Sequence, residues 1–337
     1  MRQNRFIISF IIALIFAVAY STDCNAAKKK KVQQSRPKIG LVLGGGGAKG
    51  AAEVGVLKYI EESGVKIDYI AGTSIGAIIG ALYSVGYRAA DLDSLFHSQE
   101  WLSLLADRDL ENSGKFISHR DSTTYLFGFP IKRPKNKAAD HSRTLGLSRG
   151  DSIVSLFTRM TGHEKPINFS RLPIPFRCVA VNIRKFQEVI LRSGSLPMAM
   201  RASMAIPGVF KPVELDSMLL VDGGMKNNLP VDVVKEMGAE KVIAIDLTQN
   251  KHFDRKKKEE GSAPKNQWQT MFRWLTQRPD LNKYKENLKM VDIYINPDLK
   301  GCSAADFKPK KIAYMIEQGE KAGKMALKDL KKLASKR

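Results

Sequence analysis

Between residues 38 and 85, one pattern of apolar and polar positions occurs twice. The apolar run Lys38–Leu43 enters the glycine-rich stretch Gly44–Gly50, after which Ala51–Ser63 carries apolar residues at helical spacing. The second copy consists of Ile67–Ala71, the tight turn Gly72–Gly76 and the small-residue segment Ile75–Val85. Two consecutive strand–loop–helix units predict a parallel sheet with crossover helices, so the expected fold class is α/β.

Further apolar runs extend this pattern toward the end of the chain. The expected strands are Phe176–Val181, Glu188–Leu191, Met218–Val221, Lys241–Leu247 and Val291–Ile295. The expected helices are Ser148–Thr161, Ser195–Ala205, Val231–Met237 and the basic Lys310–Leu333. Two stretches lack regular periodicity. We expect residues 87–150 to form a cap over the site and residues 251–290 to form a charged insertion.

The N-terminus has the layout of a secretory signal peptide. Arg2 and Arg5 precede the apolar run Phe6–Tyr20, and Cys24-Asn25-Ala26 then provides a small-x-Ala cleavage site. We therefore expect an exported protein, in the periplasm, in the cell envelope or secreted. A retained anchor is one alternative, because the run is only slightly shorter than the roughly 17 to 25 residues that span a bilayer. Lipidation at Cys24 is another, although Thr22-Asp23 before it is a poor lipoprotein processing site.

These features predict the domain organisation. Residues 1–26 form the signal peptide, 27–37 a basic linker and 38–250 the catalytic domain, and 291–337 complete that domain with a strand and a helix. Without the signal peptide, Cys178 and Cys302 are the remaining cysteines, too few for a disulfide framework and without metal-ligand spacing. The sequence therefore predicts neither a metal nor a cofactor.

The chain is strongly basic, with a formal net charge of +21. Removal of Arg2, Arg5 and Asp23 with the signal peptide leaves 53 basic and 33 acidic residues. For an exported protein, this charge favours anionic membrane lipids over nucleic acid, for which no aromatic-interleaved platform is present. Candidate aromatic residues for the apolar part of such a contact are Trp101, Phe127, Phe129, Trp268, Phe272 and Trp274.

The second glycine turn matches the Gly-x-Ser-x-Gly pattern of a nucleophilic serine. Its residues are Gly72, Thr73, Ser74, Ile75 and Gly76. Glycines two positions before and after the serine leave room for a sharp strand-to-helix turn that exposes the hydroxyl at a helix N-terminus. The motif is weak alone, but here an apolar strand precedes it and a helix follows it. Ser74 is therefore the candidate nucleophile.

The first glycine stretch offers free backbone amides at a helix start, which is an anion-binding arrangement. A dinucleotide site would also need an acidic residue at the end of the second strand, where Gly-Thr-Ser stands instead. A phosphate-binding nucleotide loop would need Gly-Lys-Ser/Thr, which Lys49-Gly50-Ala51 does not supply. We prefer an oxyanion hole beside Ser74. Its candidate residues are Gly45, Gly46, Gly47, Ala48, Lys49 and Gly50.

A serine nucleophile needs a base, and Asp222 is the candidate. It follows the apolar run Met218–Val221, so we expect it at the C-terminal end of a strand, at the sheet edge where Ser74 emerges. Gly223 and Gly224 then allow a close turn. An isolated Asp-Gly-Gly is most often only a turn, so this assignment depends on the other two motifs.

These three motifs, in this order, resemble those of the patatin-like phospholipase family. The resemblance runs from about Lys38 to Leu247 and includes Ala202–Pro207 and Asp222–Pro230. It implies a three-layer α/β fold with a mostly parallel central sheet, helices on both faces and a cap. It also implies a Ser-Asp dyad, in which Ser74 attacks an ester, Asp222 accepts its proton, the glycine loop binds the oxyanion and an acyl-enzyme forms.

Two other interpretations remain open. An α/β-hydrolase triad needs a histidine after the acid, and His252, in a charged segment, is the only one downstream of Asp222. The other histidines are His97, His119, His141 and His163. A catalytically silent lipid- or envelope-binding module is the second alternative. The sequence leaves open the lipid class, the ester position and the oligomeric state, including a homodimer.

Overall fold

The computed structural model describes residues 36–107, 148–163, 165–249 and 281–335, together with the backbone of Phe116–Ile117 and Thr124–Tyr125, strands β3 and β4. The expected signal peptide, most of the basic linker, most of the cap and most of the charged insertion lie outside the described residues. The domain boundaries expected there remain predictions.

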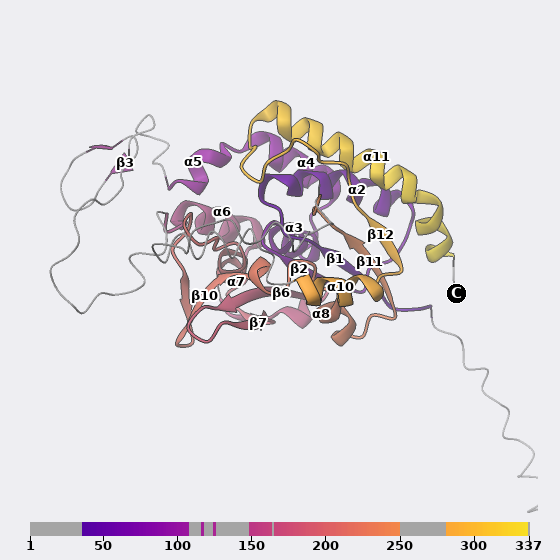
Figure 1. The fold of residues 1–337 in the computed structure, drawn as a ribbon, viewed down its shortest axis with the longest axis horizontal. Coiled ribbons are helices and arrows are strands. Elements are labelled where there is room, and N and C mark those ends of the chain that lie inside the picture. The colour runs from indigo at the N-terminus through magenta and orange to yellow at the C-terminus, as the bar shows by residue number, and fades with distance from the viewer. Residues whose placement is uncertain are drawn as a thin grey trace, which may run out of the picture. The chain divides into compact units, whose positions relative to one another are not determined.

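An eight-stranded sheet forms the centre of the structure (Figure 1). Its strands are β1 (Ile39–Leu43), β2 (Tyr69–Thr73), β6 (Phe176–Asn182), β7 (Gln187–Leu191), β9 (Val213–Leu215), β10 (Met218–Asp222), β11 (Lys241–Ile245) and β12 (Ile293–Ile295). They lie in the order β12-β11-β1-β2-β6-β10-β9, and β7 also pairs with β6. The neighbours from β12 to β6 run parallel, whereas β7 and β10 are antiparallel to β6. The expectation of a mostly parallel sheet is confirmed.

Strand β6 brings two other strands together end to end. One edge of β6 pairs with β7 over residues 178–182. On the opposite edge, β2 pairs with residues 176–179, where Thr73 lies beside Val179, and β10 pairs with residues 180–182, where Asp222 lies beside Ala180. The C-terminal ends of β2 and β10 therefore meet head-on. We expected Asp222 at a strand end near Ser74, but not that its strand would run in the opposite direction.

Helices cover both faces of the sheet. They are α2 (Ala51–Glu62), α3 (Ile75–Ser84), α4 (Ala89–Ser98), α5 (Trp101–Leu105), α6 (Asp151–Thr161), α7 (Leu196–Ser203), α8 (Val231–Glu236), α10 (Leu281–Lys289) and α11 (Pro309–Ala334). Alternate residues of β1 face opposite sides: Leu41 packs in the core with α2, α3, α7 and α11, and Val42 packs with α8 and α10. This is a three-layer arrangement, visible in Figure 1.

Two elements differ from the sequence expectation. The first part of the expected cap forms α4, which packs on α2 with Leu92 and Phe96 buried, so it belongs to the three-layer body. The last part of the expected charged insertion forms α10, whose Tyr284 is buried in the core beside α8. Both helices have a polar outer face. Because of these polar residues, the amino-acid composition of the two segments did not indicate that one side of each helix is buried.

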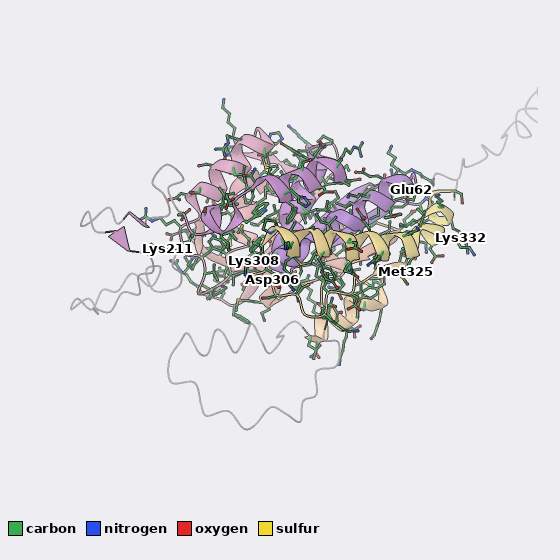
Figure 2. All side chains as sticks on the ribbon, turned by 90° about the horizontal axis from the view of Figure 1, so that it is seen from above. Glu62, Lys211, Asp306, Lys308, Met325 and Lys332 are labelled. Carbon is green, nitrogen blue, oxygen red and sulfur yellow. The ribbon has the colours of Figure 1, made fainter. Side chains whose placement is uncertain are left out.

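Helix α11 packs along α2 and reaches the outer surface (Figure 2). A β-carbon on Gly319 would overlap the Ala52 carbonyl, and one on Gly55 would overlap the Ile316 carbonyl, so glycine on both helices permits a backbone-to-backbone approach. Lys58 of α2 adds ion pairs, with its Nζ 2.7 Å from Asp93 of α4 and 2.6 Å from Glu320 of α11. The basic C-terminal helix is thus part of the folded body.

The helix crossing predicts a position-specific effect on stability. Gly319→Ala places a methyl group against backbone that has no room to move, so we expect the free energy of unfolding to fall by about 2 kcal/mol or more. Gly323→Ala is the matched control, because its β-carbon would meet only Tyr59 side-chain atoms at 3.0 Å or beyond. Urea unfolding measures both variants. Equal losses would contradict the close crossing.

Candidate functional site

Ser74 occupies a strained turn between β2 and α3. Its backbone φ is 56°, a left-handed conformation that costs a non-glycine residue about 1–3 kcal/mol. The flanking glycines permit the turn: a β-carbon on Gly72 would overlap the Gly76 carbonyl, and one on Gly76 would overlap the Leu43 carbonyl. Ile75 begins α3, and the Ser74 carbonyl accepts its first backbone bond, from Ala77 at 2.9 Å. This is the geometry of a nucleophile elbow.

Asp222 forms a hydrogen bond with the hydroxyl of Ser74. The Ser74 hydroxyl donates to Oδ2 of Asp222 at 2.7 Å, across 148 positions of sequence. The other carboxylate oxygen, Oδ1, accepts the Gly224 amide at 2.7 Å. A β-carbon on Gly223 would overlap the Val179 carbonyl, so glycine is needed where the chain turns back toward β6. Both members of the expected dyad therefore lie in direct contact.

The environment of Asp222 favours its neutral form. Ser74 and Asp222 are each only 5% exposed. Burial raises the pKa of Asp222 to about 6, while the hydrogen bonds from Ser74 and Gly224 oppose this rise because they stabilise the carboxylate. A carboxylate whose pKa lies near neutrality retains more basicity than an ordinary aspartate and remains ionised at pH 7.

Two hydroxyl groups fasten the turn that carries Ser74. The Ser74 amide donates to Oγ of Ser203 at 3.0 Å, and the Ser203 hydroxyl donates to the Val179 carbonyl at 2.6 Å. The Thr73 hydroxyl donates to the Asn227 carbonyl at 2.8 Å. Ser203 lies in the Ala202–Pro207 stretch noted for the family resemblance, but the sequence assigned it no role. Its contacts join segments far apart in the chain, so no local sequence pattern could have predicted its role.

The glycine loop has two amides left for a ligand. The Gly44 amide donates to Ile245, Gly45 to Asn228, Ala48 to Ala304 and Lys49 to Gly46, all at backbone carbonyls and at 2.8–3.3 Å. Gly50 closes the 3₁₀ helix η1 (Gly47–Gly50) that leads into α2. The amides of Gly46 and Gly47 donate to no acceptor among the described residues. Of the six expected oxyanion-hole residues, these two can still donate.

The loop lies directly against the nucleophile. A β-carbon on Gly45 would come 3.3 Å from Cβ of Ser74 and would overlap Oδ1 of Asn228. Asn228 also donates from Nδ2 to the Gly45 carbonyl at 3.1 Å, so one asparagine contacts the loop through both side chain and backbone. Asn228 is half-buried and was not singled out in the sequence.

A polar network behind this asparagine fixes its segment. Asn227 donates to Glu188 at 2.9 Å and to Asp232 at 2.8 Å. Asn287 of α10 donates to Oδ1 of Asn227 at 3.0 Å and to the Leu229 carbonyl at 2.7 Å, and Lys283 of α10 pairs with both Glu188 and Asp232. Helix α10 therefore fixes residues 227–229, and Asn228 in this segment binds the glycine loop.

A buried acid lies beneath the loop and outside the dyad. Glu53, in the first turn of α2, is fully buried, and neither carboxyl oxygen has a hydrogen-bond partner among the described residues. Burial raises the pKa of Glu53 well above its usual range, and the negative charge of Asp246 adds to the effect. The neutral acid is the form that this site accommodates.

Histidines and metal ligands are absent from the site within the described residues. His97 lies on α4 and contacts Asp93, 2.9 Å away, and His163 follows α6. His119, His141 and His252 lie outside the described residues. The described part of the chain holds no group of three or more His, Cys, Asp or Glu residues that could bind a metal.

Among the described residues, no helix has the length and apolar content needed to cross a membrane.

A family model described as Patatin-like phospholipase matches residues 41–235. An uncharacterized NTE family protein of Mycobacterium tuberculosis is 32% identical over 213 residues, which cover 63% of this chain and 50% of the relative. Lysophospholipase nte1 of Aspergillus fumigatus is 28% identical over 315 residues, 87% of this chain and 18% of the relative. The chain thus spans about half the length of the mycobacterial relative and less of the fungal one.

Solved structures with a related arrangement have low sequence identity to this chain. VipD from Legionella pneumophila has a TM-score of 0.49 and 16% identity, covering 88% of this chain and 67% of its own. The type III effector protein ExoU has a TM-score of 0.42 and 13% identity, covering 88% of this chain and 53% of its own.

The pKa of Asp222 predicts how stability changes with pH. Burial raises this pKa from 3.8 to about 6, so the folded state binds the proton more tightly than the unfolded chain. The wild type therefore loses stability as the pH rises through this window, by roughly 3 kcal/mol for a shift of about two units. Asp222→Asn has no such proton, so it should gain on the wild type between pH 4 and pH 8 in urea unfolding. A stability difference independent of pH would contradict this.

Proposed function

The chain belongs to the patatin-like phospholipase family, and from that membership we propose that it is a lipid acyl hydrolase working through Ser74 and Asp222. One observation carries the proposal: the hydroxyl of a strained, elbow-type serine donates to a buried aspartate at 2.7 Å. That arrangement supplies a nucleophile and a base without a histidine. The name of the fungal relatives, lysophospholipase, makes phospholipid and lysophospholipid esters the first substrates to test.

The proposed reaction has two steps. Oγ of Ser74 forms a bond to the ester carbonyl carbon while its proton passes to Asp222, and the oxyanion accepts hydrogen bonds from the Gly46 and Gly47 amides. The carbonyl–alkoxy bond breaks, and the leaving alcohol takes the proton from Asp222. Water then gives a proton to Asp222 and attacks the acyl-enzyme. The acyl–Oγ bond breaks, the fatty acid leaves and Ser74 regains the proton.

Two features argue against the alternatives. A Ser-Asp-His triad would place a histidine against Asp222, but among the described residues the hydrogen bonds to its two carboxylate oxygens come from Ser74 and Gly224. A silent binding module would have no need for a serine held at φ 56° against a base, because such strain persists chiefly where a site requires it.

The dyad predicts the effect of two substitutions. Ser74→Ala and Asp222→Asn should each lower kcat/KM for ester hydrolysis by about three orders of magnitude or more, as members of one catalytic unit do. His252→Ala is the control and should change little. Because the base must be ionised, wild-type kcat/KM should rise with pH, reach half of its maximum near pH 6 and approach a plateau about one pH unit higher. Loss of activity in His252→Ala equal to that in Ser74→Ala would support the triad instead.

We also propose that the exported protein acts at anionic membranes, with lipid as both substrate and docking surface. The net charge of +20 that remains without the signal peptide, from 53 basic and 33 acidic residues, supports this, as does the outer face of α11. That face exposes Lys310, Lys321, Lys324, Lys328, Lys331 and the 86%-exposed Met325. Trp101 is not available for the contact, because it is buried against Phe96 and Phe307. The other candidate aromatic residues lie outside the described residues.

Vesicle binding tests this docking. Binding should be stronger to phosphatidylglycerol vesicles than to phosphatidylcholine vesicles and should weaken as salt rises, since a basic residue near an anionic surface contributes about 1 kcal/mol that salt screens. Charge reversal of Arg255–Lys258, a cluster outside the described residues, should weaken the binding without touching the dyad. Co-sedimentation measures both effects. Salt-independent binding, or no preference for the anionic lipid, would contradict the proposal.

A further inference from the structure

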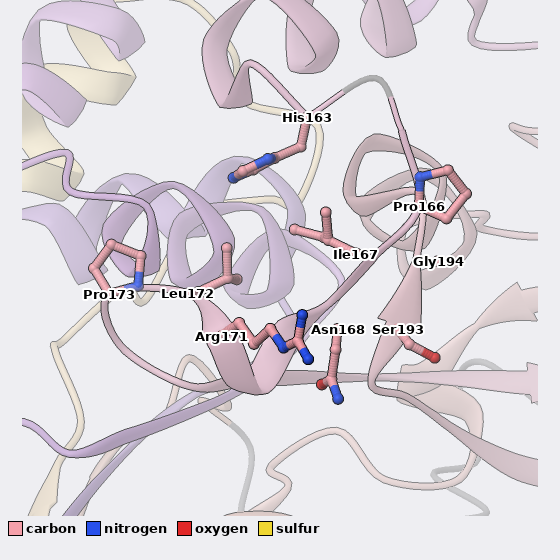
Figure 3. Close-up of a pocket in the computed structure, with 9 residues that line it drawn as sticks. All are labelled: His163, Pro166, Ile167, Asn168, Arg171, Leu172, Pro173, Ser193 and Gly194. Carbon is pink, nitrogen blue, oxygen red and sulfur yellow. The ribbon is translucent and has the colours of Figure 1, made fainter.

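A second concave site lies apart from Ser74 and Asp222 (Figure 3). It has a volume of about 570 Å³, within the range of small-molecule sites. Nine residues line it: His163, Pro166, Ile167, Asn168, Arg171, Leu172, Pro173, Ser193 and Gly194. None of them belongs to the dyad, the glycine loop or the turn that carries Ser74.

Backbone pairing gives the pocket fixed walls. Strands β5 (Ile167–Asn168) and β8 (Ser193–Gly194) pair antiparallel, and the 3₁₀ helix η4 (Phe169–Arg171) follows β5. The buried Phe169 donates its amide to the Arg192 carbonyl at 3.0 Å, and Asn168 caps η4 through its side chain. The backbone of β5, η4 and β8 is therefore fixed by hydrogen bonds within the protein.

The lining combines an apolar wall with positive charge. Pro166, Ile167, Leu172 and Pro173 are apolar, and Arg171 supplies the cation. The Arg171 guanidinium makes no hydrogen bond or ion pair with the described residues, and no carboxylate is among the nine lining residues. Arg171 is exposed and pairs with no carboxylate among the described residues, so its charge beside an apolar wall suits a ligand with a small anionic head and an apolar chain.

The pocket also adjoins the helix that supports the nucleophile. Strand β8 leads into Ser195, whose side chain caps the start of α7 by accepting the Met198 amide. Helix α7 ends at Ser203, which accepts the Ser74 amide. A ligand on β8 would therefore contact the segment that leads into this support.

We infer that this pocket is a second lipid site that binds a single-chain anionic amphiphile, with its carboxylate or phosphate head paired to Arg171 and its chain on the apolar wall. The carboxylate of a fatty acid and the phosphate of a lysophospholipid share this chemistry. The binding does not depend on hydrolysis, so it stands or falls separately from the proposed function.

The test uses the full chain carrying Ser74→Ala, and none of the ligands contains a carboxylic ester, so that binding is measured without any acyl transfer at Ser74. Isothermal titration with decanoate and decyl phosphate, both below their micelle concentrations, measures binding, with inorganic phosphate and neutral decyl maltoside as reference ligands. Arg171→Gln should weaken binding of both anionic amphiphiles about tenfold or more, because a charge-assisted contact is lost. Arg192→Gln is the matched control, an exposed arginine next to the pocket that does not line it.

A second variant and the reference ligands sharpen the result. Ser193→Glu places a carboxylate in the lining and should also weaken binding of the anionic amphiphiles. Tighter binding of decanoate would indicate a fatty acid as the natural ligand, and tighter binding of decyl phosphate a phospholipid head; either supports the inference. Equal affinities in Arg171→Gln and Arg192→Gln would overturn it. So would binding of inorganic phosphate or decyl maltoside as tight as that of decyl phosphate.

Discussion

The site depends on two strands that run toward each other along one edge of β6. Because β2 ends beside Val179 and β10 ends beside Ala180, backbone pairing brings Thr73 and Asp222 to adjacent positions before any side chain makes contact. The strained turn after β2 then points the Ser74 hydroxyl at the carboxylate. The register of β6 therefore sets the distance between Ser74 and Asp222, and a shift of one residue in either pairing would move the carboxylate away from Ser74.

Burial gives Asp222 the raised pKa that its proposed role as a base requires. Burial destabilises the charged carboxylate and so raises the pKa of Asp222 to about 6. The hydrogen bonds from Ser74 and Gly224 stabilise the carboxylate and limit this rise. The same burial excludes water, so the hydrogen bond to Ser74 is stronger than it would be at the surface. The strain at Ser74 is held by interactions elsewhere: Ser203 and Thr73 fix the two sides of the turn to neighbouring strands and loops.

Features encoded by neighbouring residues could be predicted from the sequence, and features made by distant contacts could not. Glycine spacing and apolar runs predicted the two strand–turn–helix units, the elbow and the loop, since each depends on local conformation. Nothing local reveals that β10 runs opposite to β2, or that Ser203 and Asn228 hold the site, because those facts follow from tertiary pairing. The sequence did not predict helix α10, because the helix buries only two residues, Tyr284 and Asn287, and most of its other residues are polar.

The glycine loop is held at both ends and left open in the middle. Ile245 and Asn228 engage the amides of Gly44 and Gly45, and Ala304 engages that of Ala48, so distant parts of the chain fix the loop on either side of Gly46 and Gly47. Ala304 lies between β12 and α11, and α11 packs on α2, the helix that the loop enters. Helix α11 and the segment before it therefore support the glycine loop at two places, at Ala48 and through α2.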